Sequence, residues 1–257
     1  MSPRRTAVAA AGTAALGLIL APAAFAVRVS FSPDSFLTYQ PGEWSLRWYG
    51  AFAADRRWAA AAGRSLLVAG LAAAVAVGTG TPLAYAVTRY HFRGRGVAAA
   101  AAVLPACVPP AVLGMGLLPL FYATRLWGTL AGLVLAHGLL GLPVVFLTVA
   151  AHLRQGGTEL EAAARGLGAS AWQAARRVTL PLLRPAVLAG GAAAFVVSLN
   201  ESMVTLFLAT PSTETLPAVV WPQLRFAASP LVAVASCLST VAALGGALVV
   251  MRFVRRG

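Results

Sequence analysis

Few residues in this sequence could do chemistry, and those few lie inside long apolar stretches. Glu201 is the one acidic residue within an apolar run long enough to span a bilayer, and His137 lies in the middle of another run. A carboxylate at bilayer depth costs about 2.5–3.5 kcal/mol, so Glu201 is a functional candidate by default. The alternative is that it reaches the outer interface or pairs with a neighbouring subunit. For His137 we expect a hydrogen bond between helices rather than a proton relay.

The sequence contains no residue pattern that is typical of catalysis or of metal binding. Cys107 and Cys237 lie far apart in apolar runs without metal-like spacing, so we interpret both as core or lipid-facing residues. A serine protease within the membrane would need its serine in a span, whereas Gly168–Ala171 (GASA) lies in a connection and Gly63–Leu66 (GRSL) at an interface. The chain has no lysine, so it cannot form the phosphate-binding loop of an ATPase. We therefore expect no enzyme activity and no cofactor.

The composition is that of an integral membrane protein. Of the 257 residues 59% are hydrophobic and 11% are charged, with a mean hydropathy of +0.79, whereas soluble domains are about 25% charged. All 20 basic residues are Arg, and the net charge is +13. These arginines fall between apolar runs instead of forming the basic stripe that nucleic acid requires. The bilayer is therefore the expected partner of this surface, and nucleic acid is not.

Six apolar runs are long enough to cross about 30 Å of hydrocarbon. Because each spanning backbone must satisfy its own hydrogen bonds, we predict an all-α protein with six transmembrane helices in one domain, 1–257. Prolines and glycines inside the runs should kink helices or allow close packing, as at Pro109, Gly138 and Gly141. The predicted spans are about 6–27, 65–87, 97–122, 129–150, 186–207 and 230–251.

The distribution of arginine predicts that both termini face the cytoplasm. With that orientation 13 arginines lie inside and 7 outside. The inside set is Arg4, Arg5, Arg89, Arg93, Arg95, Arg154, Arg165, Arg176, Arg177, Arg184, Arg252, Arg255 and Arg256, and the outside set is Arg28, Arg47, Arg56, Arg57, Arg64, Arg125 and Arg225. The first 26 residues also read as a secretory signal, with an Arg pair and a terminal AFA, but this run is longer than a usual signal core.

The connection between the fourth and fifth runs, residues 158–185, is long and patterned, and we call it the elbow. Thr158 with Glu161 and Ser170 with Gln173 have the spacing of capping boxes, and glycines lie between the two pairs. We therefore predict two short helices joined by a glycine turn, with a bend at Pro181 and Pro185 starting the fifth span. In the second helix, one face should carry Trp172, Ala175, Val178, Thr179 and Leu182, while Gln173, Arg176, Arg177 and Arg184 point elsewhere.

The elbow resembles the cytoplasmic signature of the membrane subunits of binding-protein-dependent ABC importers. That signature reads EAA, three residues, Gly, nine residues, Ile, one residue, Leu-Pro. From Gly168 the second half fits, with Val178 in place of Ile and then Leu180-Pro181. In the first half Ala163 keeps its place, but Glu161 lies one residue early and Ala162 stands where Glu is expected. Glu161 is therefore either the displaced signature residue or a capping residue only.

Other stretches are similar to the polyamine (spermidine/putrescine) type of these permeases. They include SFSPDSF and WSLRWYGAF after the first run, RSLLVAGLAAAVAVGTGTPLAYAVTRY across the second, and TLPAVVWPQLRFAASPLVAVAS before the sixth. Members often read SLDE in the fifth span, where this chain has Ser198, Leu199, Asn200 and Glu201. Asn200 thus lacks a negative charge that could attract a cation.

The resemblance implies a type I ABC importer permease, a non-catalytic subunit in the bacterial cytoplasmic (inner) membrane. It implies three partners: a separate ABC ATPase subunit, a second permease subunit that forms a heterodimer with this chain, and an extracytoplasmic solute-binding protein. The residues it assigns to ATPase coupling are Glu161, Ala163, Gly168, Val178, Leu180 and Pro181, and its candidates for the translocation path are Asn200 and Glu201.

Several alternatives stay open at this point. The solute could be a polyamine, a phosphonate, ferric iron or another small solute. Arg176, Arg177 and Arg184 could bind anionic lipid headgroups instead of the ATPase. A stand-alone six-span carrier or channel is the main rival class, although carriers usually show buried charges or paired half-helices at the midplane. Such a carrier would not need the elbow.

Overall fold

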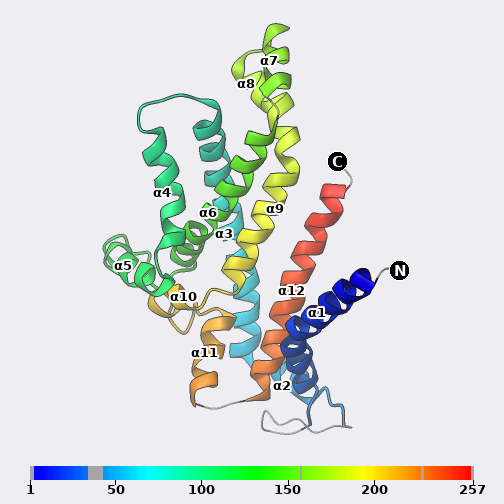
Figure 1. Ribbon diagram of the computed structural model, residues 1–257. Helices are drawn as coiled ribbons and strands as arrows, with labels where there is room; N and C mark the ends of the chain where they lie inside the picture. The colour runs from blue at the N-terminus through cyan, green and yellow to red at the C-terminus, as the bar shows by residue number, and fades with distance from the viewer. Residues whose placement is uncertain (1–2, 34–42, 157, 227–228, 256–257) are drawn as a thin grey trace. The chain divides into compact units, whose positions relative to one another are not determined.

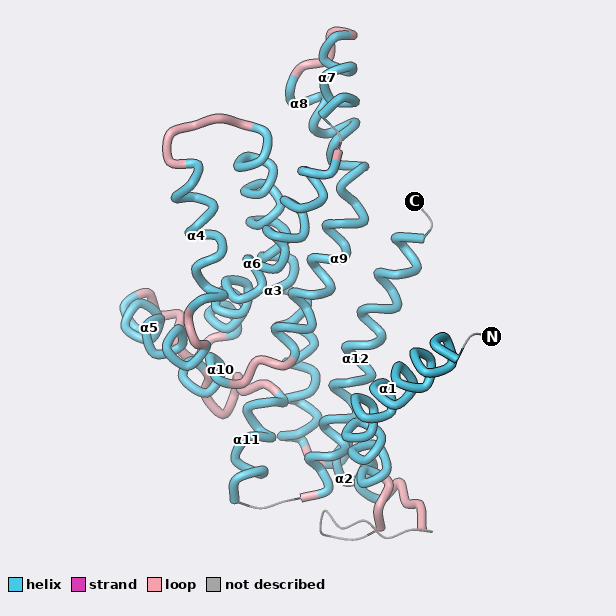
Figure 2. The backbone as a smooth tube through the Cα atoms, viewed as in Figure 1, coloured by secondary structure: helices cyan, strands magenta, loops and turns pink. Residues whose placement is uncertain are grey.

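The computed structural model describes residues 3–33, 43–156, 158–226 and 229–255, and within these ranges every regular element is a helix (Figures 1 and 2). The all-α class is therefore confirmed. The elements are α1 (Pro3–Ser30), α2 (Arg47–Ala54), α3 (Arg56–Arg89), α4 (Arg95–Cys107), α5 (Pro110–Ala123), α6 (Leu130–Gln155), α7 (Thr158–Gly166), α8 (Ala171–Ala174), the π-helix η1 (Ala175–Thr179), α9 (Leu180–Leu199), α10 (Met203–Leu208), α11 (Leu216–Phe226) and α12 (Pro230–Arg255).

Among the described residues, five helices are long and apolar enough to cross a membrane. They are Gly12–Ser30 in α1, Arg56–Arg89, Leu130–Gln155, Ala171–Leu199 and Pro230–Leu248 in α12. A sixth span results if α4 and α5 are counted together, although they meet at 112°. The predicted run 97–122 is therefore not one straight helix.

The break in this third span has a covalent cause. Pro110 is the first residue of α5, and Pro109 before it adopts an extended backbone with φ −55° and ψ 134°. A proline disfavours helical geometry in the residue before it and has no N–H to donate to the preceding turn. Two adjacent prolines thus end α4 and restart the chain in a new direction.

The fifth span differs from its prediction at both ends. At its start, α8, η1 and α9 form one continuous helix from Ala171 to Leu199, so Pro181 does not bend the chain out of the helix and Pro185 lies inside it. Pro181 is tolerated because it lies in the first turn of α9, directly after the π-helical turn. At its C-terminal end the helix stops at Leu199, and a three-residue break separates it from α10.

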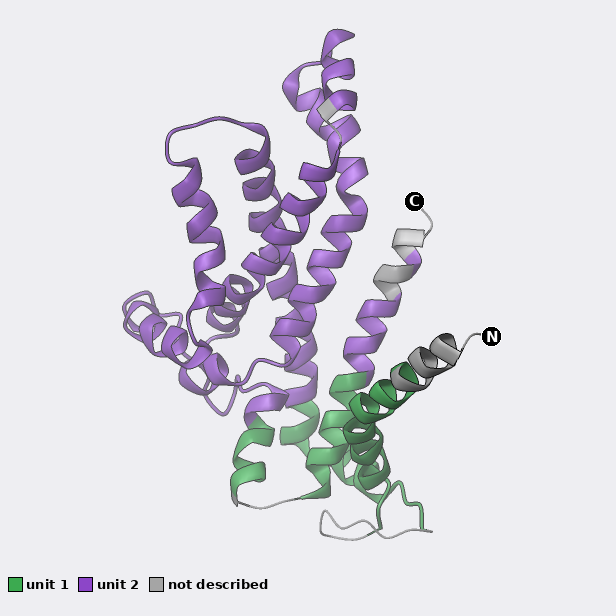
Figure 3. Cartoon of the chain, viewed as in Figure 1, with its two compact units in different colours: residues 1–60, 219–240 green, residues 61–218, 241–257 purple. Residues whose placement is uncertain are grey.

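The chain divides into two compact units (Figure 3): residues 1–60 with 219–240, and residues 61–218 with 241–257. The single permease domain that the sequence predicts over 1–257 stays a prediction. In the first unit, Ser30 at the end of α1 shares a hydrogen bond with the Tyr49 hydroxyl of α2 at 2.8 Å. The Cys237 thiol of α12 donates to the same Ser30 hydroxyl at 3.5 Å. Cys237 is thus a buried core residue of this unit.

The second unit is built around α6, which packs against α4 and α9. Leu133, Val145 and Val149 of this helix are fully buried. Its glycines allow the close packing that the sequence predicts: a Cβ added at Gly141 would lie 2.9 Å from the Ala194 Cβ of α9, and one at Gly138 would lie 2.8 Å from Val75 of α3. Small residues here let backbones approach to a distance that side chains would prevent.

The segments that connect the long helices of the second unit lie at its two opposite ends. Figure 1 shows the loop between α3 and α4 at the same end as the elbow helices α7 and α8, while α5 and α10 lie at the opposite end. The pair α4–α5 therefore begins at the elbow end of the unit and finishes at the other end.

Candidate functional site

The elbow consists of two short helices joined by a tight glycine turn, as the sequence predicts. Gly168 has φ +90°, in the left-handed region that residues with a Cβ rarely adopt. Across the turn, the Ala169 N–H donates to the carbonyl of Ala164 at 3.1 Å, which closes the end of α7. This geometry returns the chain toward the membrane within four residues, 167–170.

The second capping box is confirmed, and the first stays a prediction. The Ser170 hydroxyl accepts the Gln173 N–H at 3.2 Å, and the Gln173 side chain accepts the Ser170 N–H at 2.9 Å. Thr158 is the first residue of α7, but its side chain lies outside the described residues. The start of α8 is therefore held by two reciprocal bonds at the point where the Gly168 turn ends.

The elbow exposes large apolar side chains in both of its helices and in the turn between them. Leu167 in the turn is 91% exposed, Trp172 in α8 is 72% exposed, and Leu160 in α7 is 56% exposed. Of the apolar face predicted for the second helix, Ala175 and Thr179 are buried, whereas Trp172 and Leu182 are not. That prediction was partly wrong because the π-helix changes the angle per residue, so a period of 3.6 does not run through it.

Glu161 is the most heavily bonded acidic residue of the described elbow. Its Oε1 accepts the Tyr85 hydroxyl of α3 at 2.8 Å, and its Oε2 accepts the Thr179 hydroxyl of η1 at 3.0 Å. The Arg89 Nε of α3 lies 3.6 Å from Oε2, and the two side chains are only 9% and 13% exposed, Arg89 first. Glu161 therefore ties both elbow helices to the end of α3, which is a larger role than capping.

The partners of Glu161 were not identified from the sequence. Tyr85 lies 76 residues before Glu161, and Thr179 lies 18 residues after it. The available signal was that Tyr85 and Arg89 are four residues apart and so share one face at the end of a span. Nothing in the sequence said which residue this face meets.

The other predicted coupling residues surround this contact without joining it. Ala163 is exposed on α7, and its carbonyl accepts the Leu167 N–H at 3.1 Å. Val178 is half-buried in η1, Leu180 at the start of α9 is 53% exposed, and Pro181 is half-buried. The residues that match the signature thus lie at three places: the exposed turn at Gly168, the Glu161 contact to α3, and the start of α9 at Leu180 and Pro181.

Asn200 and Glu201 lie in the break between α9 and α10, not inside a continuous helix. The Glu201 Oε1 accepts the Val204 N–H at 2.9 Å, which caps the start of α10, and the side chain is half-buried. The exposed Asn200 donates its side-chain amide to the Val196 carbonyl at 2.9 Å. The geometry therefore gives both residues a structural bond, and their place in the translocation path stays a prediction.

His137 makes the hydrogen bonds between helices that the sequence predicts. The residue is fully buried in α6. The distance from its Nδ1 to the Ser198 hydroxyl of α9 is 2.8 Å, and that from its Nε2 to the Thr205 hydroxyl of α10 is 3.0 Å. Both ring nitrogens are satisfied, so the imidazole holds α9 and α10 in register across their break.

Cys107 is exposed at the end of α4. In the described part of the chain, no group of three His, Cys, Asp or Glu side chains is placed to hold a metal ion.

The fold and the elbow define a membrane-embedded transport subunit, and comparisons with known proteins agree. Residues 65–256 match the model of the binding-protein-dependent transport system inner membrane component family, and the chain belongs to that family. It is 32% identical to the putrescine transport system permease protein PotI of Escherichia coli K12, over 82% of this chain and 78% of that protein. It is 30% identical to the spermidine/putrescine permease protein PotC of Haemophilus influenzae, over 90% and 88%.

Two further similarities widen this picture. A probable molybdenum ABC transporter permease of Haloferax volcanii is 39% identical over 63% of this chain and 62% of that protein. Among solved structures, a bacterial ABC transporter involved in the import of the acidic polysaccharide alginate matches with a TM-score of 0.69 at 16% identity, covering 100% of this chain and 98% of that one.

The protein is therefore a permease subunit with the type I ABC importer fold, and its described residues form five or six candidate spans. It is a multi-pass protein of the inner membrane and is not itself catalytic, because ATP is hydrolysed by a separate subunit. Its family implies an ATPase and an external binding protein as partners.

Proposed function

We propose that the elbow from Glu159 to Pro181 is the surface on which the ATPase subunit docks. The observation that carries this proposal is the exposure of Leu160 in α7, Leu167 in the glycine turn and Trp172 at the start of α8. Exposed large apolar side chains on one short segment are typical of an interface. The Gly168 turn, the second capping box and the Glu161 contact to α3 hold this surface firmly enough to transmit movement.

The test replaces the exposed apolar side chains without disturbing the turn. Leu167→Ser combined with Trp172→Ala should lower co-purification of the ATPase at least tenfold, since truncating an interface anchor costs about 2 kcal/mol or more. Leu104→Ser, at a leucine of α4 that is 61% exposed, is the matched control and should leave ATPase recovery unchanged. Wild-type recovery of the ATPase by the double variant would refute the docking surface.

We propose that the solute is a small organic cation of the polyamine class, delivered by an external binding protein. The support is the similarity to PotI and PotC over 82% and 90% of this chain, relatives named for putrescine and spermidine transport. We further propose a second, different permease subunit that forms a heterodimer with this chain, and both termini in the cytoplasm. Asn200 and Glu201 would line the path, with Glu201 supplying the negative charge.

Molybdate is the second candidate solute, because the relative from Haloferax volcanii is named for molybdenum. The sequence identity to that relative is higher than the identity to the polyamine permeases, but the match covers a shorter part of this chain. Phosphonate and ferric iron, which the family resemblance also allows, have no such relative among these matches. Uptake into vesicles that contain the complete importer separates the candidates. Labelled putrescine or spermidine should accumulate with ATP, and excess molybdate should not compete. Uptake of molybdate without uptake of either polyamine would reverse the assignment.

A further inference from the structure

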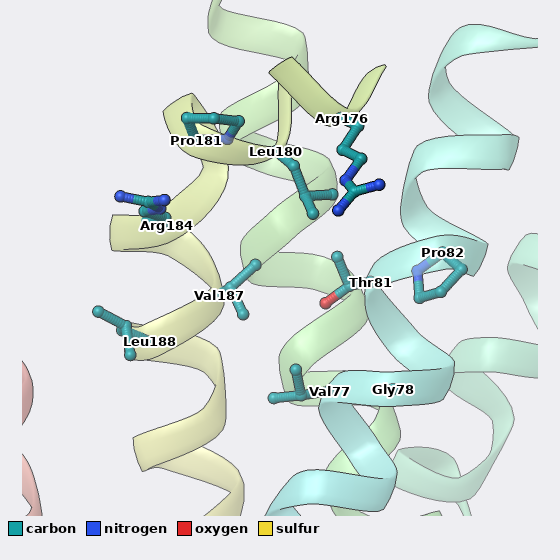
Figure 4. Close-up of a pocket in the computed structure, with 10 residues that line it drawn as sticks. All are labelled: Val77, Gly78, Thr81, Pro82, Arg176, Leu180, Pro181, Arg184, Val187 and Leu188. Atoms are coloured by element: carbon teal, nitrogen blue, oxygen red, sulfur yellow. The ribbon is translucent and has the colours of Figure 1, made fainter. Parts of the chain in front are cut away.

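A groove of about 660 Å³ runs between α3 and α9 at the elbow end of the second unit, and we call it the α3–α9 groove (Figure 4). Its walls are mostly aliphatic, and its arginines lie toward the elbow. Arg176, Leu180 and Pro181 belong both to the elbow and to this groove, but the exposed side chains proposed to dock the ATPase, Leu160, Leu167 and Trp172, do not line it. The lining residues are Val77, Gly78, Thr81, Pro82, Arg176, Leu180, Pro181, Arg184, Val187 and Leu188.

Thr81 places an unsatisfied hydroxyl in the groove. The residue is 9% exposed, and its Oγ1 is buried without a hydrogen-bond partner among the described residues. Thr79 in the same helix and Thr148 in α6 instead donate to the carbonyl four residues earlier, both at 2.7 Å. Figure 4 shows the Thr81 oxygen directed across the groove toward α9. A buried hydroxyl that is left unpaired costs about 1–3 kcal/mol, so a ligand oxygen is expected there.

Two guanidinium groups supply positive charge at the same level. In Figure 4 the Arg176 side chain extends from η1 into the space beside Thr81 and Pro82, whereas Arg184 lies at a similar level on the other side of α9, at the edge of the groove. Within the described residues neither arginine makes an ion pair with a carboxylate. Arg177, the neighbour of Arg176, does not line this groove. Arg176 and Arg184 therefore differ from Arg177 in their surroundings, a difference that the sequence analysis did not predict.

We propose that the α3–α9 groove binds one anionic phospholipid of the leaflet next to the elbow. Its phosphate would lie beside Arg176, with Arg184 adding positive charge at the edge of the groove. Thr81 would donate to an ester oxygen, and an acyl chain would lie along Val77, Val187 and Leu188. Basic residues above an apolar groove between transmembrane helices have the charge and polarity that such a lipid needs. A polyamine is excluded from this groove because two guanidinium groups would repel it. The proposal does not depend on which solute is transported.

The first experiment counts bound lipid by native mass spectrometry on the assembled importer, released from nanodiscs of phosphatidylglycerol and phosphatidylcholine. Arg176→Gln with Arg184→Gln should lower retained phosphatidylglycerol about tenfold, and Arg177→Gln should leave it unchanged. Thr81→Val, which keeps the shape of the side chain, should lower it about threefold or more. Equal retention of both lipids by the wild type, or no loss in the double variant, would overturn the proposal.

A space-filling variant tests the groove without removing charge. Gly78 faces open space, with no atom within 4 Å of an added Cβ, so Gly78→Leu should fold normally and occupy the site. Gly70→Leu in the same helix is the matched control, because Gly70 also has nothing within 4 Å and does not line the groove. Loss of lipid in Gly78→Leu but not in Gly70→Leu supports the site, and full lipid retention in both contradicts it.

The identity of the occupant is tested by a photo-crosslinking amino acid at Leu188 in membranes. An adduct with the mass of a phospholipid supports the proposal. A protein adduct to another subunit, or an adduct to labelled solute, would show that the groove belongs to the assembly interface or to the translocation path, and would overturn it.

Discussion

At the scale of single residues, the one-residue displacement of Glu161 has a structural consequence. Successive residues of an α-helix point about 100° apart. A carboxylate at position 162 would therefore leave the face that meets Tyr85 and Thr179, and Ala162 is indeed exposed. Glu161 at its actual position gives this chain a hydrogen-bonded link between the elbow and α3.

Removal of this link should loosen the elbow. In Glu161→Ala two hydroxyls lose their acceptor and the mostly buried Arg89 loses its counter-charge, so local stability should fall by about 2–3 kcal/mol. Hydrogen–deuterium exchange of the α7 amides measures this loss as faster exchange. Glu159→Ala, a neighbouring exposed carboxylate, should leave the exchange of α7 nearly unchanged. Equal exchange in the two variants would contradict the link.

The capping bond of Glu201 changes how its role must be tested. A glutamine keeps an oxygen that can accept the Val204 N–H, whereas an alanine cannot. If Glu201 also attracts a cationic solute, Glu201→Gln should lower uptake several-fold with a normal yield of complex. Glu201→Ala should lower both, since loss of a cap costs about 1 kcal/mol. Uptake and yield in vesicles are measured side by side, and normal uptake by Glu201→Gln would remove Glu201 from the translocation path.

At the scale of elements, the conformation of the elbow depends on one backbone angle. The surroundings of Gly168 are open, with no atom within 4 Å of an added Cβ, so a larger side chain would not collide with anything. Its φ of +90° is the constraint. A larger residue at position 168 would therefore strain the backbone without crowding its neighbours.

Three substitutions separate strain from size. Gly168→Leu should cost about 1–2 kcal/mol of backbone strain and reduce ATPase co-purification. Gly168→Asn should be milder because Asn tolerates the left-handed region. Gly70→Leu adds the same side chain in α3, outside the elbow, where the backbone is helical and the space is open, and should bind ATPase normally. Normal ATPase recovery in Gly168→Leu would mean that the turn can relax without loss of docking.

At the scale of the whole molecule, features that depend on residues close in the sequence were predicted, whereas features that depend on contacts between distant segments were not. Apolar runs, the glycine turn and the Ser170–Gln173 box depend on neighbours within a few residues, and the sequence located them. The Tyr85–Glu161 contact, the π-helical turn and the 112° bend of α4 against α5 depend on packing between distant segments or on how much a proline pair redirects the chain. A single sequence contains no measure of those interactions.

The bent pair α4–α5 decides the topology, because the number of crossings fixes which side each terminus occupies. If the pair crosses, four spans precede the elbow and two follow it, so both termini share its side. If the pair were re-entrant, three spans would precede the elbow and the N-terminus would lie opposite. Figure 1 favours a crossing, since the α3–α4 loop lies at the elbow end of the second unit and α5 at the other end.

We therefore expect both termini to face the cytoplasm, in agreement with the arginine ratio of 13 to 7. A fluorescent protein fused after Gly257 should fluoresce, and alkaline phosphatase at the same place should be inactive. An epitope tag before Met1 should resist protease added to spheroplasts and become sensitive after lysis. A protected C-terminus with an accessible N-terminal tag would mean that α4–α5 returns to the side it left. Active phosphatase after Gly257 would instead invert the whole topology and place the elbow away from any ATPase.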